Sequence, residues 1–468
     1  MNRSTTYLLL VSFLPLFTLA QDANTTTYSL KEAQEQAVKN NVQVKLAALD
    51  INIATKTVQS VGANVYPQIG ATGSFNHFID IPTSVVPANA FGFPAWFNQW
   101  ISDVGESTAI QPNFPSASGQ EFTELQFGSK FNSTIGLNVN QLIFDGSYII
   151  GLKAAKSFVE VQRLAHSKTQ MEVKSLATQA YFSVLIAQEN GEILSRNLAS
   201  IKNTYTETKE QFNTGFIEKS ALDQIQLLVS NMEISHNTAI EQLEISKKIL
   251  NFQMGLPLEE AVTLSEDLNS LAVLSTAYSL EDQFNSENHI DYQMAQTQIK
   301  LMELNKKKEQ FVYLPTLGGF FNYQRNAFSN ELDFISGKWF ATTFWGLSLN
   351  VPIFGGFGQS ANLKIAGLQL EKAQLQQAQI SEGLKLNEAS ARSAYTSALS
   401  LYINQKKNLA LAEAIRKKTG IKFKEGLASS MELTQAENQF FSTQGAYVQS
   451  VFSLLNAKTE LEKALGKF

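Results

Sequence analysis

The sequence contains no cysteine. A disulfide framework, a thiol nucleophile and a lipid-bearing N-terminal cysteine are therefore excluded. Histidine is scarce, and His77, His166, His236 and His289 show no spacing typical of metal ligands. Neither a phosphate-binding glycine loop nor a nucleophile motif occurs. The chain gives no basis for an enzyme, and we expect neither a metal nor a cofactor.

Long hydrophobic runs are also missing. Beyond the extreme N-terminus, no stretch of about 18 or more apolar residues could form a membrane-spanning helix. At the N-terminus, Arg3, the apolar segment 7–17 and the small residues ending at Ala20 predict a signal peptide over residues 1–20. The formal net charge of −5 argues against a nucleic-acid partner. We therefore expect an exported protein.

What the sequence does contain is a duplication. Three pairs of similar segments share an offset of 210 or 211 residues: 140–146 with 350–356, 212–215 with 423–426, and 254–255 with 465–466. A fourth pair, 66–70 with 314–318, is separated by 248 residues. The first copy therefore carries an insertion, which must lie within residues 80–130.

Each copy contains two segments in which apolar or small residues alternate with polar ones, as in a half-exposed β-strand. These segments lie near residues 69–76, 134–140, 317–324 and 344–351. We predict strands of about ten residues, the length that spans a membrane. The alternation is weakest in 317–324.

Long helical segments without proline follow each strand pair, from Gly146 to Phe212 and from Gly356 to Phe423. At about 1.5 Å per residue, each would extend roughly 100 Å. The helices that follow them repeat apolar and small residues every seventh position, as in a coiled coil. These seam positions are Leu433, Phe440, Tyr447, Leu454 and Leu461 with Ala436, Thr443, Ser450, Ala457 and Ala464, and in the first copy Leu222, Val229, His236, Leu243 and Leu250 with Ile225, Met232, Ala239 and Ser246.

Shorter helices are predicted before each strand pair, at 30–40 and 44–64 in the first copy and at 280–288 and 289–311 in the second. Ser29 with Glu32, and Ser279 with Asp282, supply similar N-terminal capping signals.

Four strands with one apolar and one polar face suit a membrane β-barrel with a wet interior, but four strands cannot close one. Unpaired strand edges in lipid cost roughly several kcal/mol per backbone group, so other copies of the chain must complete the sheet. Two copies would give a barrel filled by side chains, whereas three would enclose a lumen, which the polar residues favour. A soluble sandwich with a helical stalk is the alternative, since its strands would alternate in the same way.

The order and spacing of these segments resemble those of TolC-like outer-membrane efflux proteins over essentially the whole mature chain. The resemblance is carried by the duplicated tracts, by Tyr66-Pro67 and Leu314-Pro315 before strands, by Pro352-Ile353-Phe354 before a long helix, and by glycines at the helix turns. It implies an α+β, mainly α fold with a duplicated strand-strand-helix-helix unit. Four strands per chain would contribute to a homotrimeric, 12-stranded outer-membrane β-barrel continued by a long periplasmic α-helical barrel. It also implies a periplasmic adaptor and an inner-membrane transporter of the RND or ABC class as partners.

On this basis the chain divides into seven regions. They are a signal peptide (1–20); N-terminal equatorial and first periplasmic helices (21–66); a first β-hairpin (67–145) with a long extracellular loop (80–130); a first long periplasmic helical hairpin (146–256); a linker with equatorial and periplasmic helices (257–313); a second β-hairpin (314–355); and a second long periplasmic helical hairpin with the C-terminus (356–468).

The turns at 212–220 and 423–430 separate the helices of each hairpin. Gly215 and Gly426 can adopt the positive φ of a tight reversal, or can simply stop a helix. The resemblance implies that these turns are periplasmic tips that contact the adaptor. The contact residues would be Phe212, Gly215, Ser220, Phe423, Gly426 and Ser429.

Three residues near the turns are candidates for a gate: Asp223, Glu432 and Gln435. Glu432 stands where the family often carries an acid facing the narrowed mouth. Symmetry-related carboxylates there would repel one another and attract cations, although a solvated surface glutamate is equally compatible with the sequence. Gln435 stands where some members carry a second acid, and Ala428 where some carry a basic residue. We therefore expect weaker charge pairing in any gate.

Aromatic residues mark two further regions. The segment 80–130 contains Trp96 and Trp100, and it predicts an extracellular loop or partial lid, with a disordered insertion as the alternative. Trp339, Trp345 and Phe344 lie near a strand start and predict part of an aromatic girdle at the membrane interface.

The sequence thus predicts the outer-membrane exit channel of a tripartite export system for small molecules. The protein would contact outer-membrane lipid and extend through the periplasm. Two alternatives stay open: a type I protein-secretion duct of the same architecture, and a non-channel trimeric coiled-coil surface protein.

Overall fold

The computed structural model describes residues 26–87, 99–100, 103–104, 122–126, 128–276, 284–332 and 337–468. The predicted signal peptide and Trp96 lie outside these residues. The chain divides into two compact units. Unit 1 contains Lys156–Glu303 and Gly367–Phe468 together with the N-terminal part up to Lys56, and unit 2 contains Thr57–Ala155 and Leu304–Ala366.

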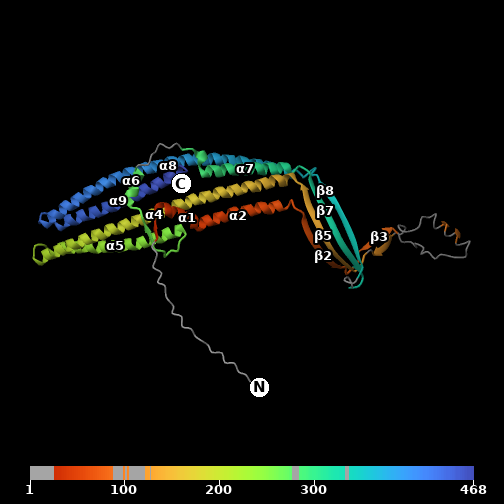
Figure 1. Ribbon diagram of the computed structural model, residues 1–468, viewed down its shortest axis with the longest axis horizontal. Helices are drawn as coiled ribbons and strands as arrows, with labels where there is room; N and C mark the ends of the chain where they lie inside the picture. Colours follow the sequence, from red (N-terminus) through yellow and green to blue (C-terminus); the bar gives the residue numbers. More distant parts are fainter. Residues whose placement is uncertain are drawn as a thin grey trace, which may run out of the picture. The chain divides into compact units, whose positions relative to one another are not determined.

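Unit 2 is built on a four-stranded antiparallel sheet in the order β2-β5-β7-β8 (Figure 1). Its strands are β2 (Gln68–His77), β5 (Phe131–Phe144), β7 (Thr316–Ser329) and β8 (Trp339–Asn350). The two strands of each repeat form neighbouring pairs, and β5 joins β7 across the repeats. β2 and β8 are therefore the edges of the sheet.

Three of the four strands of this sheet are longer than predicted. β2 has 10 residues, but β5 and β7 have 14 each and β8 has 12. Backbone pairing continues past the positions where side chains alternate, because a neighbouring strand satisfies the N–H and C=O groups whatever the side chains are. A bulge between Leu142 and Phe144 ends the regular pairing of β5 with β7. Within the predicted loop 80–130, β3 (Thr83–Pro87) pairs with β4 (Phe122–Gln126).

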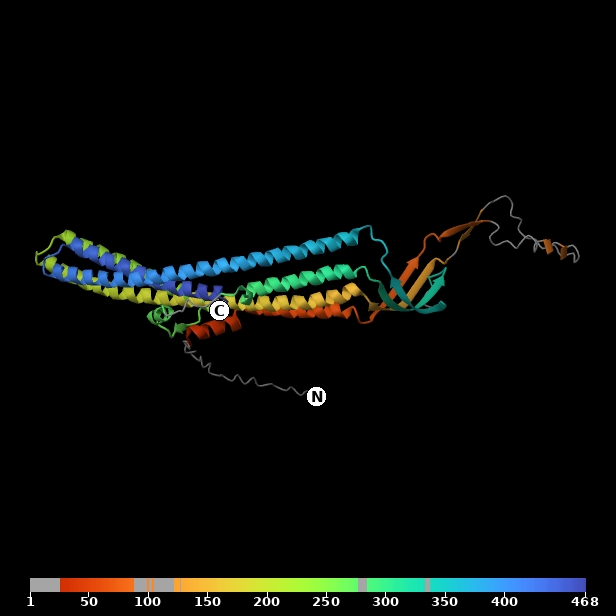
Figure 2. The same cartoon turned by 90° about the horizontal axis from the view of Figure 1, so that it is seen from above.

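Two helical hairpins contain the longest helices of the structure (Figures 1 and 2). They are α4 (Gly146–Asn213) with α5 (Lys219–Met254), and α8 (Gly358–Lys424) with α9 (Ser430–Ala464). α4 begins at the predicted glycine, where the Asp145 carboxylate accepts a hydrogen bond from the Tyr148 N–H over 3.1 Å. α8 begins two residues later than predicted, because Gly356 and Phe357 have positive φ values of 59° and 64° and cannot continue a helix. The predicted α+β, mainly α fold is confirmed.

The seam positions predicted for α5 and α9 form the core of unit 1. Leu433, Phe440, Leu454 and Leu461 of α9 are buried, as are Ile225, Met232 and Leu250 of α5. The largest cluster joins Leu250, Leu454 and Leu461 to Tyr181 of α4 and Tyr395 of α8. Large and small residues alternating along the seam let the helices approach closely, so the heptad pattern predicted this packing correctly.

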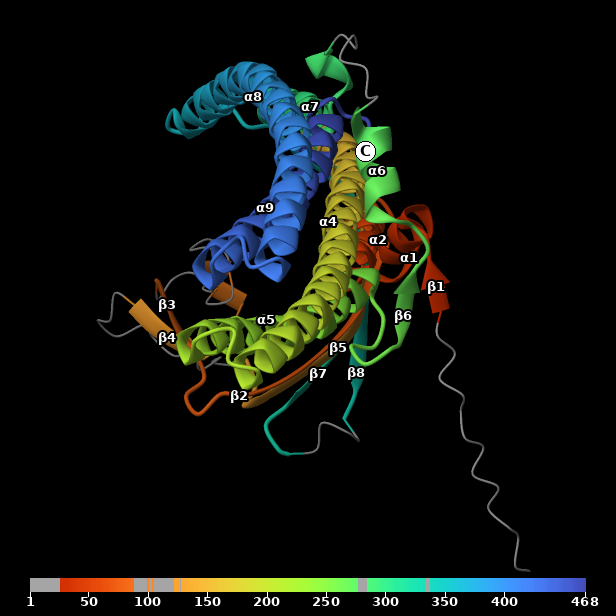
Figure 3. The same ribbon diagram turned by 90° about the vertical axis from the view of Figure 1, so that its left-hand side faces the viewer.

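Short elements cover one flank of these hairpins (Figure 3). β1 (Thr26–Tyr28) pairs in parallel with β6 (Val262–Leu264), beside α1 (Leu30–Asn40) and α6 (Leu268–Thr276). The predicted capping box of Ser29 and Glu32 is present. Of the helix predicted at 280–288, residues 284–288 are described and contain only the 3₁₀ turn η1 (Ser286–Asn288), and Ser279 and Asp282 lie outside the described residues.

Two further helices, α2 (Val42–Ala63) and α7 (Ile290–Phe311), precede β2 and β7. Both agree with the predicted ranges within two residues. Among the helices that the structure describes, none combines the length and the apolar character needed to cross a membrane.

Candidate functional site

The four-stranded sheet has an apolar face that is largely exposed. Strand register places Ala71, Leu137, Tyr323 and Thr343 in one row across the sheet. On the same face, Ile69 is 74% exposed, Leu137 49% and Trp345 76%. Large apolar side chains exposed over a whole face indicate contact with an apolar phase or with another protein. We call this surface the apolar face.

The opposite surface, which we call the polar face, is made of amides, hydroxyls and a few phenyl rings. Apart from glycines and Leu142 near the end of β5, it consists of Gln68, Thr72, Ser74 and Asn76 of β2, Asn132, Thr134, Asn138 and Asn140 of β5, Thr316, Phe320, Asn322, Gln324, Asn326 and Phe328 of β7, and Phe340, Thr342, Phe344, Ser348 and Asn350 of β8. No aspartate, glutamate, lysine, arginine or histidine is among them. His77 and Arg325 lie on the apolar face, in register with Phe131 and Ile135. The polar face is therefore hydrophilic but uncharged.

The sheet edges β2 and β8 each have a strand partner on one side only within the described chain. Because β2 and β8 run in opposite directions in an antiparallel sheet of even strand number, the β8 edge of one copy can pair antiparallel with the β2 edge of another. Both edges of the sheet could therefore accept a further strand.

The turns of the two hairpins have the same backbone structure. Gly215 and Gly426 have φ values of 80° and 72°, and their N–H groups bond to the carbonyls of Phe212 and Phe423. The N–H of the next residue bonds five residues back in each case, which completes a Schellman motif. The residues after the glycines, Phe216 and Leu427, are 84% and 77% exposed. Each turn therefore presents an unpaired apolar side chain.

The predicted contact residues at the turns divide into exposed and buried ones. Ser220 and Ser429 are exposed and Phe212 is half-buried. Phe423 is buried in a cluster with Ile225 of α5 and Leu433 of α9, so its side chain joins the hairpins instead of facing a partner. A groove of ≈ 790 Å³ between the two turns is lined by Phe216, Ser429 and other turn residues.

Asp223, Glu432 and Gln435, the candidate gate residues, are all exposed. Glu432 also has a local structural role that the gate interpretation did not include. Its carboxylate accepts a hydrogen bond from the Ser429 N–H over 2.9 Å, and the Ser429 hydroxyl accepts one from the Glu432 N–H over 3.2 Å. This capping box begins α9, and it leaves the carboxylate in contact with solvent.

A buried ion pair joins three helices near the turns. Arg416 of α8 donates from Nε to Glu437 of α9 over 2.8 Å and from Nη2 to the Ser200 hydroxyl of α4 over 2.7 Å. Its guanidinium also lies over the Phe440 ring, 4.7 Å from the centroid. Glu437 is only 5% exposed. Burial raises the pKa of Glu437 above its usual value, and Arg416 only partly offsets this shift.

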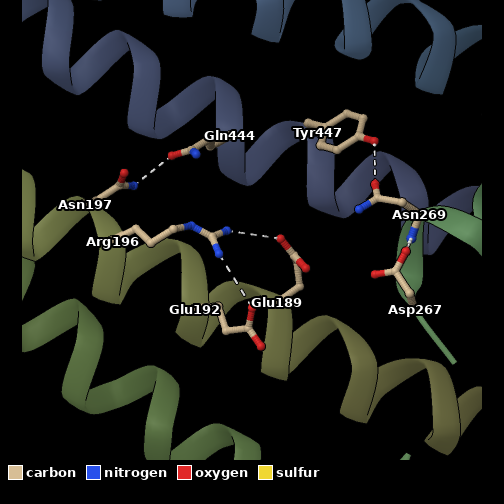
Figure 4. A network of polar contacts seen from close by, with 8 residues as sticks. All are labelled: Glu189, Glu192, Arg196, Asn197, Asp267, Asn269, Gln444 and Tyr447. Carbon is tan, nitrogen blue, oxygen red and sulfur yellow. Dashed lines mark hydrogen bonds and ion pairs between the residues drawn. The ribbon is translucent and has the colours of Figure 1, made fainter. Parts of the chain in front are cut away.

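A second polar network connects α4, α9 and the start of α6 (Figure 4). Asn197 donates to Gln444 over 2.7 Å, and the Tyr447 hydroxyl contacts Asn269 over 3.2 Å. Burial and the neighbouring Tyr402 raise the pKa of Tyr447 to about 12, so it acts as a neutral hydrogen-bonding group near neutral pH. Asp267 caps α6 by accepting from the N–H groups that follow it. The network fixes α6 to the hairpins.

The aromatic girdle prediction is only partly compatible with the structure. Trp345 is exposed on the apolar face in the middle of β8, and Trp339 is half-buried at its start. Phe344 lies on the polar face, because successive residues of a strand point to opposite sides. Phe344 is thus on the opposite side of the sheet from Trp345 and Trp339, and cannot share one girdle with them. Trp100 is exposed.

The residues that sequence analysis missed had weak but recognisable signals. Phe216 and Leu427 directly follow the turn glycine in both repeats, which is a repeated apolar residue in a turn. Arg416 and Glu437 had no such signal, because each looks like an ordinary charged residue on a long helix. In the described part of the chain, no group of three or more acidic or histidine side chains could hold a metal ion.

The sequence of this chain is similar to those of known outer-membrane efflux proteins. Residues 286–467 match the sequence model of a family described as outer membrane efflux protein. The outer membrane efflux protein BepC of Brucella suis is 22% identical over 341 residues, which cover 71% of this chain and 72% of BepC. The probable efflux pump outer membrane protein TtgC of Pseudomonas putida is 19% identical over 449 residues, which cover 94% of this chain and 83% of TtgC.

A solved structure shares the whole fold. The CmeC outer membrane channel of Campylobacter jejuni superposes with a TM-score of 0.68 at 17% identity, over 99% of this chain and 94% of CmeC.

Proposed function

We propose that the chain belongs to the outer membrane efflux protein family, whose sequence model matches residues 286–467, and that three copies form a passive channel that carries small molecules out of the periplasm. As an efflux protein of this family it is located in the outer membrane and extends into the periplasm. The observation that supports the proposed channel most directly is the sheet, with its exposed apolar face, uncharged polar face and two open edges.

The way in which such a sheet can close supports the proposed trimer. With the β8 edge of each copy paired to the β2 edge of the next, the strands alternate in direction around the ring without interruption. The apolar faces then contact lipid and the polar faces line the interior. Three copies supply twelve strands, enough for an open lumen, whereas eight strands would enclose only side chains. The channel itself carries out no chemistry and uses no cofactor.

Conductance of the purified protein tests this proposal. The oligomer, shown to be a trimer by cross-linking, is inserted in a planar lipid bilayer. We expect stepwise ion conductance, and a larger conductance when both hairpin turns are shortened. A cross-linked trimer that inserts but conducts in neither form would overturn the channel and would favour a non-channel surface protein.

The hairpin turns are proposed to bind the periplasmic adaptor of a tripartite pump, whose inner-membrane transporter is of the RND or ABC class. Phe216 and Leu427 support this, because each turn exposes one large apolar side chain, and Phe216 also lines the groove between the turns. Buried apolar anchors dominate binding energy at protein interfaces. Gly215, Ser220, Gly426 and Ser429 would shape and border the contact.

Replacing Phe216 and Leu427 together with serine is expected to weaken adaptor binding by about tenfold or more. Neither side chain is buried, so the trimer should form normally. Binding of the purified adaptor to immobilised trimer measures the effect. Leu258→Ser, which removes an exposed leucine outside the turns, is the matched control. If the wild-type protein, the double variant and the Leu258→Ser control bound the adaptor equally, the turns would not be part of the docking surface.

Glu432 is proposed to set the cation preference of the channel mouth, since its carboxylate stays exposed in the capping box. Glu432→Gln keeps a residue suited to that box but removes the charge. We expect a lower cation-to-anion permeability ratio, measured as the reversal potential in a KCl gradient. Glu425→Gln removes another exposed acid from the same turn and should have a smaller effect. An unchanged reversal potential for Glu432→Gln would leave this residue with its capping role alone.

A further inference from the structure

The polar face of the sheet carries two aromatic pairs, both on β7 and β8. Phe320 and Phe344 meet edge to face, with ring centroids 6.1 Å apart. Phe328 and Phe340 meet at a tilt, with centroids 6.3 Å apart. Phe320 and Phe328 are eight residues apart on one strand, so the pairs are separated by roughly 26 Å. The polar faces of β2 and β5 have no aromatic residue.

The Phe320 ring lies over a backbone position that is kept free by glycine. A Cβ atom added at Gly346 would approach the ring to 2.7 Å, which is too close for any real side chain. Gly346 is directly opposite Phe320 in the register. Only glycine lets this ring lie flat across β8 toward Phe344, so the aromatic pair is a feature built into the sheet.

Amide groups occupy the space between the two pairs. On the polar face of β7, Asn322, Gln324 and Asn326 follow one another between Phe320 and Phe328, and Thr342 of β8 lies opposite Gln324. The Oδ1 atom of Asn322, and that of Asn138 opposite it on β5, are buried and have no hydrogen-bond partner within the described residues. Buried amide oxygens normally accept a hydrogen bond, so the acceptors at this position of the polar face are not satisfied within the described residues.

We propose that the polar face of β7 and β8 is a transit site for uncharged aromatic solutes that carry amide or hydroxyl groups. This inference rests on the proposed channel, in which the polar face lines the lumen. The aromatic part of a solute stacks on one of the two phenyl pairs, and its polar groups bond to the amides between them. The absence of charge on this face favours neutral solutes, because a charged one would find no group of opposite sign.

Transit requires weak binding at more than one place. A site must hold a solute well enough to admit it and weakly enough to release it. Each copy carries two phenyl pairs on β7 and β8. Together the copies provide several weak binding places along the lumen. An interaction of this kind is expected to bind in the millimolar range.

Ligand-observed saturation-transfer NMR on the purified trimer tests the site. The probes are N-acetyltryptophanamide and N-acetylleucinamide, two neutral amides that differ in having an aromatic or an aliphatic side chain. We expect the aromatic probe to bind more tightly. The double variant Phe320→Leu/Phe344→Leu should weaken its binding by about 3- to 10-fold. Phe321→Leu changes the adjacent residue on the apolar face and is the matched control.

The outcomes separate this site from the channel itself. Conductance is measured on the same preparations. Binding of the aromatic probe that is lost in the double variant but kept in Phe321→Leu supports the site. A conducting trimer that binds both probes equally, or whose binding is the same in the double variant, overturns the transit site and leaves the channel intact. A trimer that does not conduct overturns the channel.

Discussion

Replacing Thr343 with arginine is expected to reduce sharply the amount of trimer inserted in the outer membrane, whereas replacing its neighbour Thr342 is not. Both threonines are exposed in the middle of β8. Thr343 shares the apolar face with Leu137 and Tyr323, and Thr342 shares the polar face with Gln324. Arginine on the lipid side of a barrel costs about 2–4 kcal/mol near the membrane centre, and every copy in the proposed trimer would add this cost.

The Thr342→Arg variant is also expected to change the ion selectivity of the channel. In the proposed channel its guanidinium would lie on the polar face, which has no charged side chain, once in each copy. The channel should insert normally and become anion-selective, which the reversal potential in a salt gradient reports. Insertion is measured as heat-resistant trimer in isolated outer membranes. Equal insertion of the two variants, or selectivity unchanged in Thr342→Arg, would show that the faces are assigned incorrectly.

Removing Arg416 should cost more stability than removing any exposed ion-pair partner. Arg416→Met leaves the carboxylate of Glu437 buried without a counter-charge, and breaking a buried pair in this way costs about 3–5 kcal/mol. The matched control is Lys202→Met. It breaks a pair of similar length, 2.6 Å to Glu233, in which both side chains are about half exposed. Exposed pairs contribute about 0–1 kcal/mol, so the control should be nearly neutral.

The effect of Arg416→Met should depend on pH. Burial raises the pKa of Glu437 in the folded protein, so its contribution to stability is fully present below the usual pKa of a glutamate. That contribution is lost as the pH rises through the raised, folded-state pKa. Without Arg416 this pKa rises further. The loss of stability then continues to higher pH and becomes larger. The destabilisation should therefore be smaller at pH 5 than at pH 8.

Thermal unfolding of the purified trimer, followed by circular dichroism at both pH values, measures this difference. The double variant Arg416→Met/Glu437→Met should recover most of the lost stability, because a buried pair can often be replaced by apolar side chains of similar volume. A deficit that is the same at pH 5 and pH 8, or that the second substitution does not relieve, would contradict the buried-charge explanation.

The element order and the helix packing could be predicted from the sequence, because both repeat. Similar segments at one offset identify equivalent elements without knowledge of what each contacts. Seam residues such as Leu433 and Leu454 recur with a period that only helix packing explains, and they are buried as predicted. The weak alternation near Phe320 also has an explanation, since this phenylalanine lies on the polar face and covers Gly346.

Features that depend on a single long-range contact could not be predicted in this way. Glu437 directly follows the seam residue Ala436, and nothing in its local sequence distinguishes it from a surface glutamate. Its environment comes from Arg416 and Ser200, which belong to other helices. Strand lengths likewise depend on where a neighbouring strand ends. The capping box at Ser429 and Glu432 is different, because its spacing equals that of Ser29 and Glu32 and the same motif identifies it.

The two unlike edges of the sheet have a genetic consequence. Each chain in the proposed ring uses its β2 edge toward one neighbour and its β8 edge toward the other, so one chain with a damaged edge leaves the whole ring open. If a cell made intact and damaged chains in equal amounts, roughly one trimer in eight would contain intact chains only. Mutations at these edges should therefore be dominant over the wild-type allele, whereas mutations that merely prevent a chain from being made should be recessive.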